Sequence, residues 1–347
     1  MYSNLSLNRF PPPAPLIAPE QLSGLQVLAR LNAPTGEKSI DTSFVYEVKE
    51  CYLTPEELLF FTEILGSTDI KRGVLPSGAE IFSAIEHHPD YYVGSAEERL
   101  LYDKKLKLLP EHAIVTELGP GDGGKAEIFF SQNHHTKSLR YQIIDTSHDF
   151  LEMTELRFSP FDRLRTISHC GDFFSAPKNF QRADVVMFLG TTISNFDKER
   201  GKHLLSEIKE NYLANNGTLI LGQDSNHNVD RLLRCYDDSG KHTTTFVMNA
   251  LRAIKREYLP ALDLNALSYH AFFDQENEAM RMGIRVIRDQ TVESILGKIS
   301  FAEGEFISVG ESRKYSIASI TEMALSAGFS SIETIPSELG VNIHIIK

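Results

Sequence analysis

Between Val115 and Lys125 the sequence passes directly from a buried-strand pattern into a turn that is dense in glycine. Residues 113–118 have the apolar, β-branched character of a parallel strand that is buried on both faces. The glycines that follow, at positions 119, 121, 123 and 124, allow the backbone to turn tightly against a ligand. We therefore expect this strand to end at a site for a nucleotide-type cofactor.

The residues around the glycines narrow the choice of cofactor. A P-loop requires Ser or Thr after Gly-Lys, whereas Ala126 follows Gly124-Lys125 in this chain. Residues 119–124 satisfy the dinucleotide pattern G-x-G-x-x-G, so a dehydrogenase is one alternative. Glu117, two residues before Gly119, instead gives E-x-G-x-G after a first strand, which is the pattern of S-adenosylmethionine (SAM) sites.

Two later segments supply groups that a bound nucleoside needs. Asp145 closes the next predicted strand, 139–145, at about the 20-residue spacing at which an acidic residue accepts hydrogen bonds from ribose hydroxyls. Gly171-Asp172-Phe173 offers a carboxylate and an aromatic ring for the adenine. Together these elements predict SAM as the cofactor. The alternative is that the glycines form an ordinary turn and that the aspartates simply end their strands.

The composition favours an enzyme that acts on small molecules. A chain of 347 residues is long enough for two domains. Its formal net charge of −12 disfavours a nucleic-acid partner, which requires concentrated positive charge. Cys51, Cys170 and Cys235 form no C-x-x-C pair, so neither a disulfide framework nor a zinc motif is indicated. No apolar stretch is long enough to span a membrane, and we expect a cytoplasmic protein of undetermined oligomeric state.

An alternation of strands and helices begins near residue 113 and predicts an α/β fold with a Rossmann-like, doubly wound sheet. After residue 224 the alternation stops, and residues 226–280 are expected to be mainly helical. The predicted strands are 113–118, 139–145, 166–170, 184–190, 217–222, 283–287, 305–309, 331–335 and 341–346. One predicted helix begins at about residue 123, and three others span 147–157, 197–213 and 317–327.

The interruption after residue 224 divides the chain into two predicted domains. A SAM-binding methyltransferase domain would comprise residues 96–225 and 313–347. A discontinuous α+β substrate-binding domain would comprise residues 1–95 and 226–312. In the N-terminal part, capping-box patterns predict helices over about 54–64 and 95–108.

Six motifs, met in order between residues 89 and 316, make the chain resemble a known family. This family comprises the SAM-dependent amino-acid N-methyltransferases typified by the histidine Nα-methyltransferase of ergothioneine biosynthesis. The resemblance implies a class I SAM methyltransferase sheet, and in-line methyl transfer to a neutral amine without a metal, giving S-adenosylhomocysteine. The motifs are Pro89-Asp-Tyr-Tyr92, Glu117-Leu-Gly-Pro-Gly121 with Lys125, Gly171-Asp-Phe173, Gly190-Thr-Thr-Ile-Ser-Asn-Phe196, Tyr236-Asp-Asp238 with Thr243, and Glu311-Ser-Arg-Lys-Tyr315.

The resemblance also implies roles for individual residues. Tyr91, Asn195 and Tyr236 would be the catalytic residues that hold the α-carboxylate and amine of an amino acid. Neutral hydroxyl and amide groups suit this task because they bury no unpaired charge. The acceptor pocket would be completed by Phe82, Gly190, Thr243, Met282, Gly310 and Ser312. The cofactor would be held by Glu117, Gly119, Gly121, Lys125, Asp145, Asp172 and Phe173.

Four of these residues also have simpler explanations. Tyr91 could pack at a hinge, and Tyr236 could lie in a surface turn. Asn195 could cap the helix that begins near residue 197, a task that Asn performs well. Lys125 could be a solvated residue in the first turn of its helix. The joint pattern favours the functional roles over all four.

One position departs from the family pattern and bears on the acceptor. Histidine-specific members place a glutamate two residues before the serine, where this chain has Gly310 before Ser312. Glu311 stands one residue later, and in an extended segment such a shift turns a side chain to the opposite face. Beside Met282, Arg281 replaces another usual glutamate. We therefore expect the α-amine of a tryptophan-like aromatic amino acid as acceptor. The alternatives are histidine and, in another class, a non-catalytic SAM-binding protein.

Overall fold

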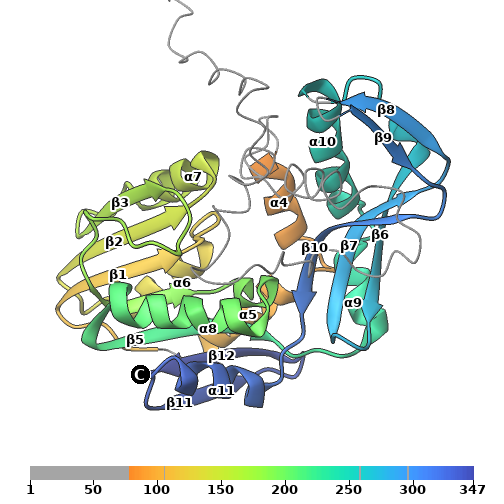
Figure 1. The fold of residues 1–347 in the computed structure, drawn as a ribbon. Helices are drawn as coiled ribbons and strands as arrows, with labels where there is room; N and C mark the ends of the chain where they lie inside the picture. The colour runs from red at the N-terminus through yellow and green to blue at the C-terminus, as the bar shows by residue number, and fades with distance from the viewer. Residues whose placement is uncertain (1–77, 105, 258, 295–296) are drawn as a thin grey trace, which may run out of the picture. The chain divides into compact units, whose positions relative to one another are not determined.

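The computed structural model describes residues 78–347 apart from 105, 258 and 295–296 (Figure 1). Cys51 and the helix predicted at 54–64 lie outside the described residues. Within the described ranges, no helix has the length and apolar character needed to cross a membrane.

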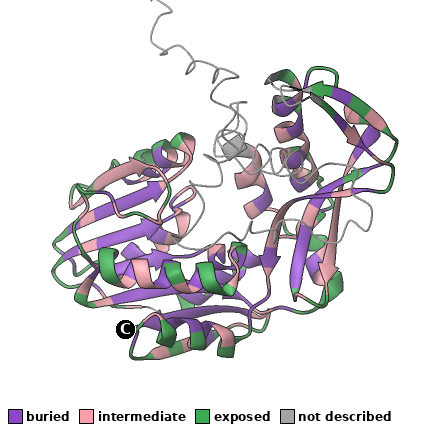
Figure 2. Cartoon of the chain, in the orientation of Figure 1, coloured by how far each residue is buried: buried purple, intermediate pink, exposed green. Residues whose placement is uncertain are grey.

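The larger sheet has seven strands in the order β11-β12-β5-β4-β1-β2-β3. Strands β1 to β5 run parallel, whereas β12 is antiparallel to both of its neighbours. Figure 2 shows that buried residues follow these strands. The predicted α/β class is therefore confirmed. The strands are β1 (His112–Leu118), β2 (Ser138–Asp145), β3 (Leu164–Cys170), β4 (Ala183–Phe188), β5 (Leu213–Asp224), β11 (Ile332–Pro336) and β12 (Val341–Ile346).

Helices cover both faces of this sheet. Alternate residues of β4 lie in two different apolar cores. Val185 and Met187 belong to the first core, and Val186 and Phe188 belong to the second. This confirms the predicted doubly wound arrangement, in which parallel strands are buried on both sides. The first core is completed by α5 (Tyr92–Lys104), α6 (Gly124–Gln132) and α7 (His148–Phe158), and the second by α8 (Lys198–Glu207), the π-helical turn η4 (Ile208–Tyr212) and α11 (Ile317–Ser326).

A second, antiparallel sheet has three strands in the order β10-β7-β6. It shares an apolar cluster with α10, in which Leu251 and Ile254 of the helix pack with Ile284 of β7. Figure 1 shows this sheet beside α9 and α10. The elements are α4 (Gly78–Glu86), α9 (Val229–Tyr236), α10 (His242–Glu257), η5 (Leu264–Ala266), β6 (Leu267–Asp274), β7 (Ala279–Val286), the hairpin β8 (Gln290–Ser294) and β9 (Gly297–Phe301), and β10 (Phe306–Arg313).

Two predicted elements differ from those observed. Residues 226–280 were expected to be mainly helical, but α10 ends at Glu257 and β6 follows, because its aromatic-rich sequence suits a strand. The helix expected at 95–108 begins at Tyr92, which is buried, and Ser95 lies inside it, donating its hydroxyl to the Tyr92 carbonyl. The domain limits given above stay a prediction.

Candidate active site

The glycine-dense turn joins β1 to α6 through a backbone that favours glycine. Gly119, Gly121 and Gly123 have φ angles of 72°, 59° and 80°, all in the left-handed region. A Cβ at Gly119 would meet no atom of the described residues within 4 Å. A Cβ at Gly123 would instead lie 3.0 Å from the Phe158 ring and 3.2 Å from Thr154. The turn therefore packs against α7 on one side and is open to a cofactor on the other.

Glu117 lies in the buried part of β1, where it is 2% exposed. Its carboxyl group accepts a hydrogen bond from the Tyr141 hydroxyl on β2. Burial raises the pKa of Glu117 to about 8, although Tyr141 and Lys125 act in the opposite direction. The carboxyl group is therefore mostly protonated at neutral pH, and it can donate as well as accept a hydrogen bond.

Lys125 connects three segments beside the turn. Its ammonium lies 3.2 Å from Glu97 of α5 and 3.6 Å from Glu86 at the end of α4. The same Glu97 oxygen accepts the backbone N–H of Gly190, which follows β4, at 2.8 Å. Burial lowers the pKa of Lys125, but the two carboxylates outweigh it and hold this pKa above its usual value. Lys125 is thus a mostly buried ion-pair centre, and the solvated alternative is wrong.

A polar pocket opens beside this ion-pair cluster, lined in part by Pro120 and Asp122 of the turn and by Glu86 and Lys125. The second oxygen of Glu97, Oε1, has no hydrogen-bond partner among the described residues. Charges of both signs therefore surround the pocket. The amino-acid end of SAM carries an ammonium and a carboxylate, so both of its charges can find a partner in this lining.

Asp145, Asp172 and Phe173 lie at the carboxyl ends of the neighbouring strands β2 and β3. The Gly171 N–H donates to the Asp145 carbonyl at 2.9 Å, which joins the two segments. Burial raises the pKa of Asp145 to about 6, although two backbone N–H groups lower it. The Phe173 ring packs edge-on against the Phe188 ring, with ring centroids 5.4 Å apart. The Asp172 side chain is exposed. All three predicted residues therefore share the sheet edge at which parallel-sheet proteins bind nucleotides.

A buried hydrogen-bond network joins Tyr236 at the end of α9 to Ser312 on β10. The Tyr236 hydroxyl donates to Ser312 Oγ at 2.7 Å. The Lys314 ammonium donates to these two oxygens at 2.9 and 3.0 Å, and to Asp224 Oδ2 at 2.8 Å. The Tyr92 hydroxyl donates to the same Asp224 oxygen at 2.6 Å. Tyr236 therefore lies in a connected network, and the surface-turn alternative is wrong.

The pairing of β10 with β7 sets the orientation of the segment that departs from the family pattern. Gly310 lies opposite Met282, after a register shift that follows Ser308. Glu311 forms ion pairs with Arg281, which is 1% exposed, and with Arg313. Residues 310 and 312 alternate with residue 311 along the strand, so Glu311 points away from the face that carries Ser312. This orientation agrees with the sequence prediction.

The other predicted acceptor residues lie in several elements. Asn195 is exposed and ends the 3₁₀ turn η3 (Thr192–Asn195). The side chain of Asp197 caps α8, so the capping explanation for Asn195 is wrong. Within the described part of the chain, no hydrogen bond joins Asn195 to Tyr91 or Tyr236, and its acceptor role stays a prediction.

Three further residues that were predicted to bind the acceptor lie in α4, in α10 and just before α5. Tyr91 is half-buried just before α5, and burial raises its pKa. Phe82 of α4 packs against Phe246 of α10, with ring centroids 6.0 Å apart. Thr243 is buried in the first turn of α10, and its hydroxyl has no hydrogen-bond partner among the described residues. Their proposed contacts with an acceptor stay predictions.

Comparison with known families decides the class of the protein. A model of the family described as "Histidine-specific methyltransferase, SAM-dependent" matches residues 34–339. The chain belongs to this family. It is therefore a SAM-dependent methyltransferase, and neither the dehydrogenase nor the non-catalytic alternative is supported.

Relatives of this methyltransferase include proteins named as N-methyltransferases. The histidine N-alpha-methyltransferase of Mycolicibacterium smegmatis is 26% identical over 259 residues, which cover 72% of this chain and 80% of the relative. The N-methyltransferase imqF of Aspergillus flavus is 25% identical over 214 residues, covering 55% and 58%. Among solved structures, a SAM-dependent methyltransferase from Clostridium acetobutylicum aligns with a TM-score of 0.45 and 14% identity, covering 73% of this chain and 91% of that one.

Sequence reasoning missed three members of the buried network of this methyltransferase. Tyr92 and Lys314 belong to two of the six family motifs, but the sequence predicted no role for either of them. Asp224 was not among the predicted site residues. Asp224 ends β5 at the same sheet edge as Asp145, so its strand-end position was the available signal. Because Asp224 neutralises Lys314, the network offers hydroxyl groups instead of an uncompensated charge.

Proposed function

We propose that this methyltransferase transfers the methyl group of SAM to the α-amine of a free amino acid, that histidine is the acceptor, and that S-adenosylhomocysteine is the second product. The family description and the relatives named histidine N-alpha-methyltransferase support histidine over the tryptophan-like acceptor that the sequence favoured. Within the molecule, the proposal rests on the linked Tyr236 and Ser312 hydroxyls.

The proposed reaction depends mainly on orientation. Bound SAM would supply an electrophilic methyl group on its sulfonium. The glycine turn and the Lys125 cluster would hold the cofactor, while Tyr236 and Asn195 would orient the neutral amine. Holding the reactants as a near-attack pair can supply roughly 7–11 kcal/mol of the barrier reduction. The α-ammonium of the free amino acid would lose a proton to water to give the neutral amine that attacks.

Recognition of the imidazole would use hydroxyl groups in this chain. Gly310 has no side chain, and Glu311 is held in ion pairs with Arg281 and Arg313. The Ser312 hydroxyl accepts from Tyr236 and Lys314, so its own proton remains free to donate to the acceptor nitrogen of a neutral imidazole. We therefore propose that histidine binds with a neutral ring.

One observation favours a second candidate acceptor, a non-histidine aromatic amino acid. A Cβ at Gly310 would lie 3.7 Å from the Met282 methyl group, so this part of β10 faces an apolar side chain. An apolar wall without a carboxylate leaves no polar protein group unpaired against a phenyl or indole ring.

A methyl-transfer screen distinguishes the two acceptors. Each proteinogenic amino acid would be incubated separately with the protein and SAM, and methylated products would be measured by mass spectrometry. We expect histidine to give the highest kcat/KM, with fragmentation placing the methyl group on the α-nitrogen. A higher kcat/KM for tryptophan, phenylalanine or tyrosine would establish the second candidate instead.

The Gly310→Glu variant tests the same segment. The space beside Gly310 accommodates a Cβ at ordinary van der Waals distance, so we expect a folded variant. A carboxylate on this face should lower the KM for histidine about threefold to tenfold, because a charge-assisted hydrogen bond replaces a weaker one. Glu303→Gln, at an exposed side chain in the turn before β10, is the control and should leave this KM within about twofold. An unchanged KM in Gly310→Glu would show that β10 does not contact the imidazole.

A further inference from the structure

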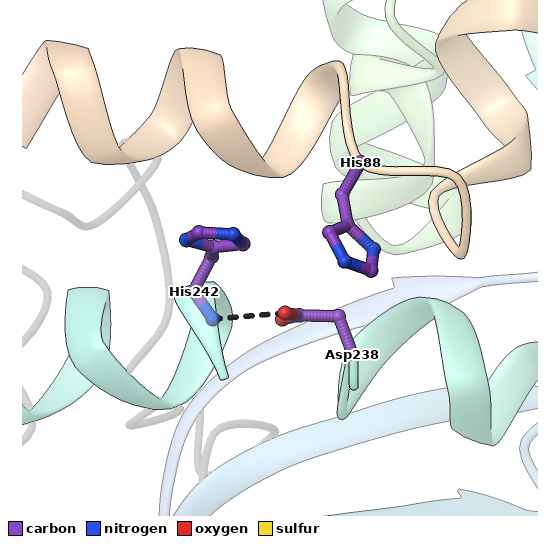
Figure 3. A group of neighbouring side chains, drawn as sticks. All are labelled: His88, Asp238 and His242. Carbon is purple, nitrogen blue, oxygen red and sulfur yellow. Dashed lines mark hydrogen bonds between the residues drawn. The ribbon is translucent and has the colours of Figure 1, made fainter. Parts of the chain in front are cut away.

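His88, Asp238 and His242 converge from two loops that are distant in sequence. His88 follows α4, Asp238 follows α9, and His242 is the first residue of α10. One potential ligand atom from each lies within 4.8 Å of the others. Figure 3 shows the Asp238 carboxylate next to both imidazole rings. The cluster therefore combines two nitrogen ligands and one oxygen ligand.

The Asp238 carboxylate is buried and oriented by backbone hydrogen bonds. It is 1% exposed and accepts the backbone N–H groups of His242 and Thr243, each at 2.8 Å. Each carboxylate oxygen has two lone pairs, so one remains on each for a cation.

The two imidazoles pack edge to face, with ring centroids 5.4 Å apart, and Gly240 lies beside both of them. A Cβ at this glycine would lie 2.7 Å from His242 Nε2 and 3.1 Å from His88 Nε2. The other ring nitrogen of His88, Nδ1, accepts the Asp90 backbone N–H at 3.2 Å and lies 3.6 Å from the Asp90 carboxylate. Metal binding at Nε2 would place the ring proton on Nδ1, which could then donate to this carboxylate, as metal-binding histidines commonly do. The glycine therefore keeps open the space into which both Nε2 atoms point.

We propose that His88, Asp238 and His242 bind one divalent transition-metal ion of the zinc type. Two imidazoles and one carboxylate suit Zn²⁺, Co²⁺ or Ni²⁺, whereas Mg²⁺ and Ca²⁺ prefer sites made entirely of oxygen. Ligand atoms that share a tetrahedral Zn²⁺ at about 2.0–2.2 Å lie about 3.4 Å apart. The two imidazoles would have to rotate for the observed spacing, within 4.8 Å, to close to this value.

Metal binding here would fix two loops that border the acceptor residues. The first loop continues into Tyr91, and the second directly follows Tyr236. Asp90 Oδ2 already joins them by accepting the backbone N–H and the hydroxyl of Ser239, at 2.8 and 2.7 Å. The ion would thus act structurally, outside the methyl-transfer chemistry. Only this consequence for the acceptor rests on the proposed function.

The test uses metal-stripped full-length protein titrated with Zn²⁺ by calorimetry and with Co²⁺ by visible absorption. We expect saturation at one equivalent and a Co²⁺ d–d spectrum of low coordination number. His88→Ala and His242→Ala should each weaken binding by more than about tenfold. His87→Ala is the matched control, because His87 is the exposed neighbour of His88 and should leave the affinity unchanged.

Gly240→Ala keeps all three ligands and places a methyl group between them. We expect it to weaken Zn²⁺ binding as strongly as the histidine variants, with unchanged circular dichroism. Binding of equal strength in wild type, His88→Ala and Gly240→Ala would overturn the proposal, as would the absence of saturable binding in the wild type. If a histidine variant does not fold, Gly240→Ala alone decides: a Zn²⁺ affinity equal to that of the wild type would overturn the proposal. None of these readouts involves methyl transfer, so failure of the site is separable from failure of the proposed function.

Discussion

The hydroxyl of Tyr236 donates to Ser312 and accepts from Lys314, so one oxygen atom links two elements at the proposed acceptor side. Tyr236→Phe removes this oxygen and keeps the ring. We expect the KM for the acceptor to rise about tenfold, the equivalent of one hydrogen bond of about 1.4 kcal/mol, with SAM affinity unchanged. Steady-state kinetics and calorimetric titration with SAM measure both. Tyr102→Phe, at a side chain that is 69% exposed, is the control, and an equal loss of SAM affinity would refute the acceptor role.

Glu117 makes stability depend on pH. Its folded-state pKa of about 8 lies above its unfolded value of about 4.3, so its stabilising contribution is complete below about pH 4.3 and is lost as the pH rises through 8. We expect the Tm of the SAM-free protein to fall between about pH 5 and 8, and to fall less in Glu117→Gln, which stays neutral. Scanning calorimetry at several pH values checks this. Parallel Tm curves for the two proteins would show that Glu117 is not buried as a neutral acid.

At the scale of elements, the Asp224–Lys314 ion pair joins the end of β5 to the residue after β10. The two atoms are 2.8 Å apart and both side chains are fully buried. Lys314→Met leaves Asp224 without a partner, and we expect the free energy of unfolding to drop by about 3–5 kcal/mol. Adding Asp224→Asn should restore part of the loss, because no buried charge then remains. Urea unfolding measures each variant.

The Glu111–Lys137 pair provides the control for this prediction. It has the same 2.8 Å separation, but its side chains are 62% and 65% exposed. We expect Lys137→Met to change the free energy of unfolding by less than about 1 kcal/mol, because solvent screens an exposed pair. If Lys314→Met lowered the free energy of unfolding by an equally small amount, the Asp224–Lys314 pair would contribute little to stability.

The elements that could be predicted from sequence are those with strong local patterns. The run at 113–118 and its glycine turn correspond to β1 and the start of α6, because an apolar strand and left-handed glycines are specified locally. The strand at 267–274 was missed because aromatic residues fit either a buried helix or a strand until a partner strand is known. The contacts of Lys314 with Asp224 depend on pairing across 90 residues, which no local spacing encodes.

At the scale of the whole molecule, β12 lies inside the larger sheet, between β5 and β11. All of its residues are buried. Deleting residues 341–347 would leave the hydrogen-bonding edge of β5 unpaired and open both apolar cores. We expect the truncated protein to be insoluble on expression, as judged by centrifugation of the lysate, whereas Lys347→Ala should remain soluble. A soluble truncated protein with native circular dichroism would show that the sheet does not need its seventh strand.

The position of β12 also has a consequence for synthesis on the ribosome. Strand β12, which joins β11 to the rest of the sheet, is translated after the other strands. One edge of β5 therefore remains unpaired while residues 225–340 are translated. The larger sheet therefore cannot be completed until residues 341–346 have been translated. A nascent chain stopped anywhere in that interval already contains every residue expected to bind SAM, yet it exposes a strand edge of the kind that chaperones and aggregates recognise.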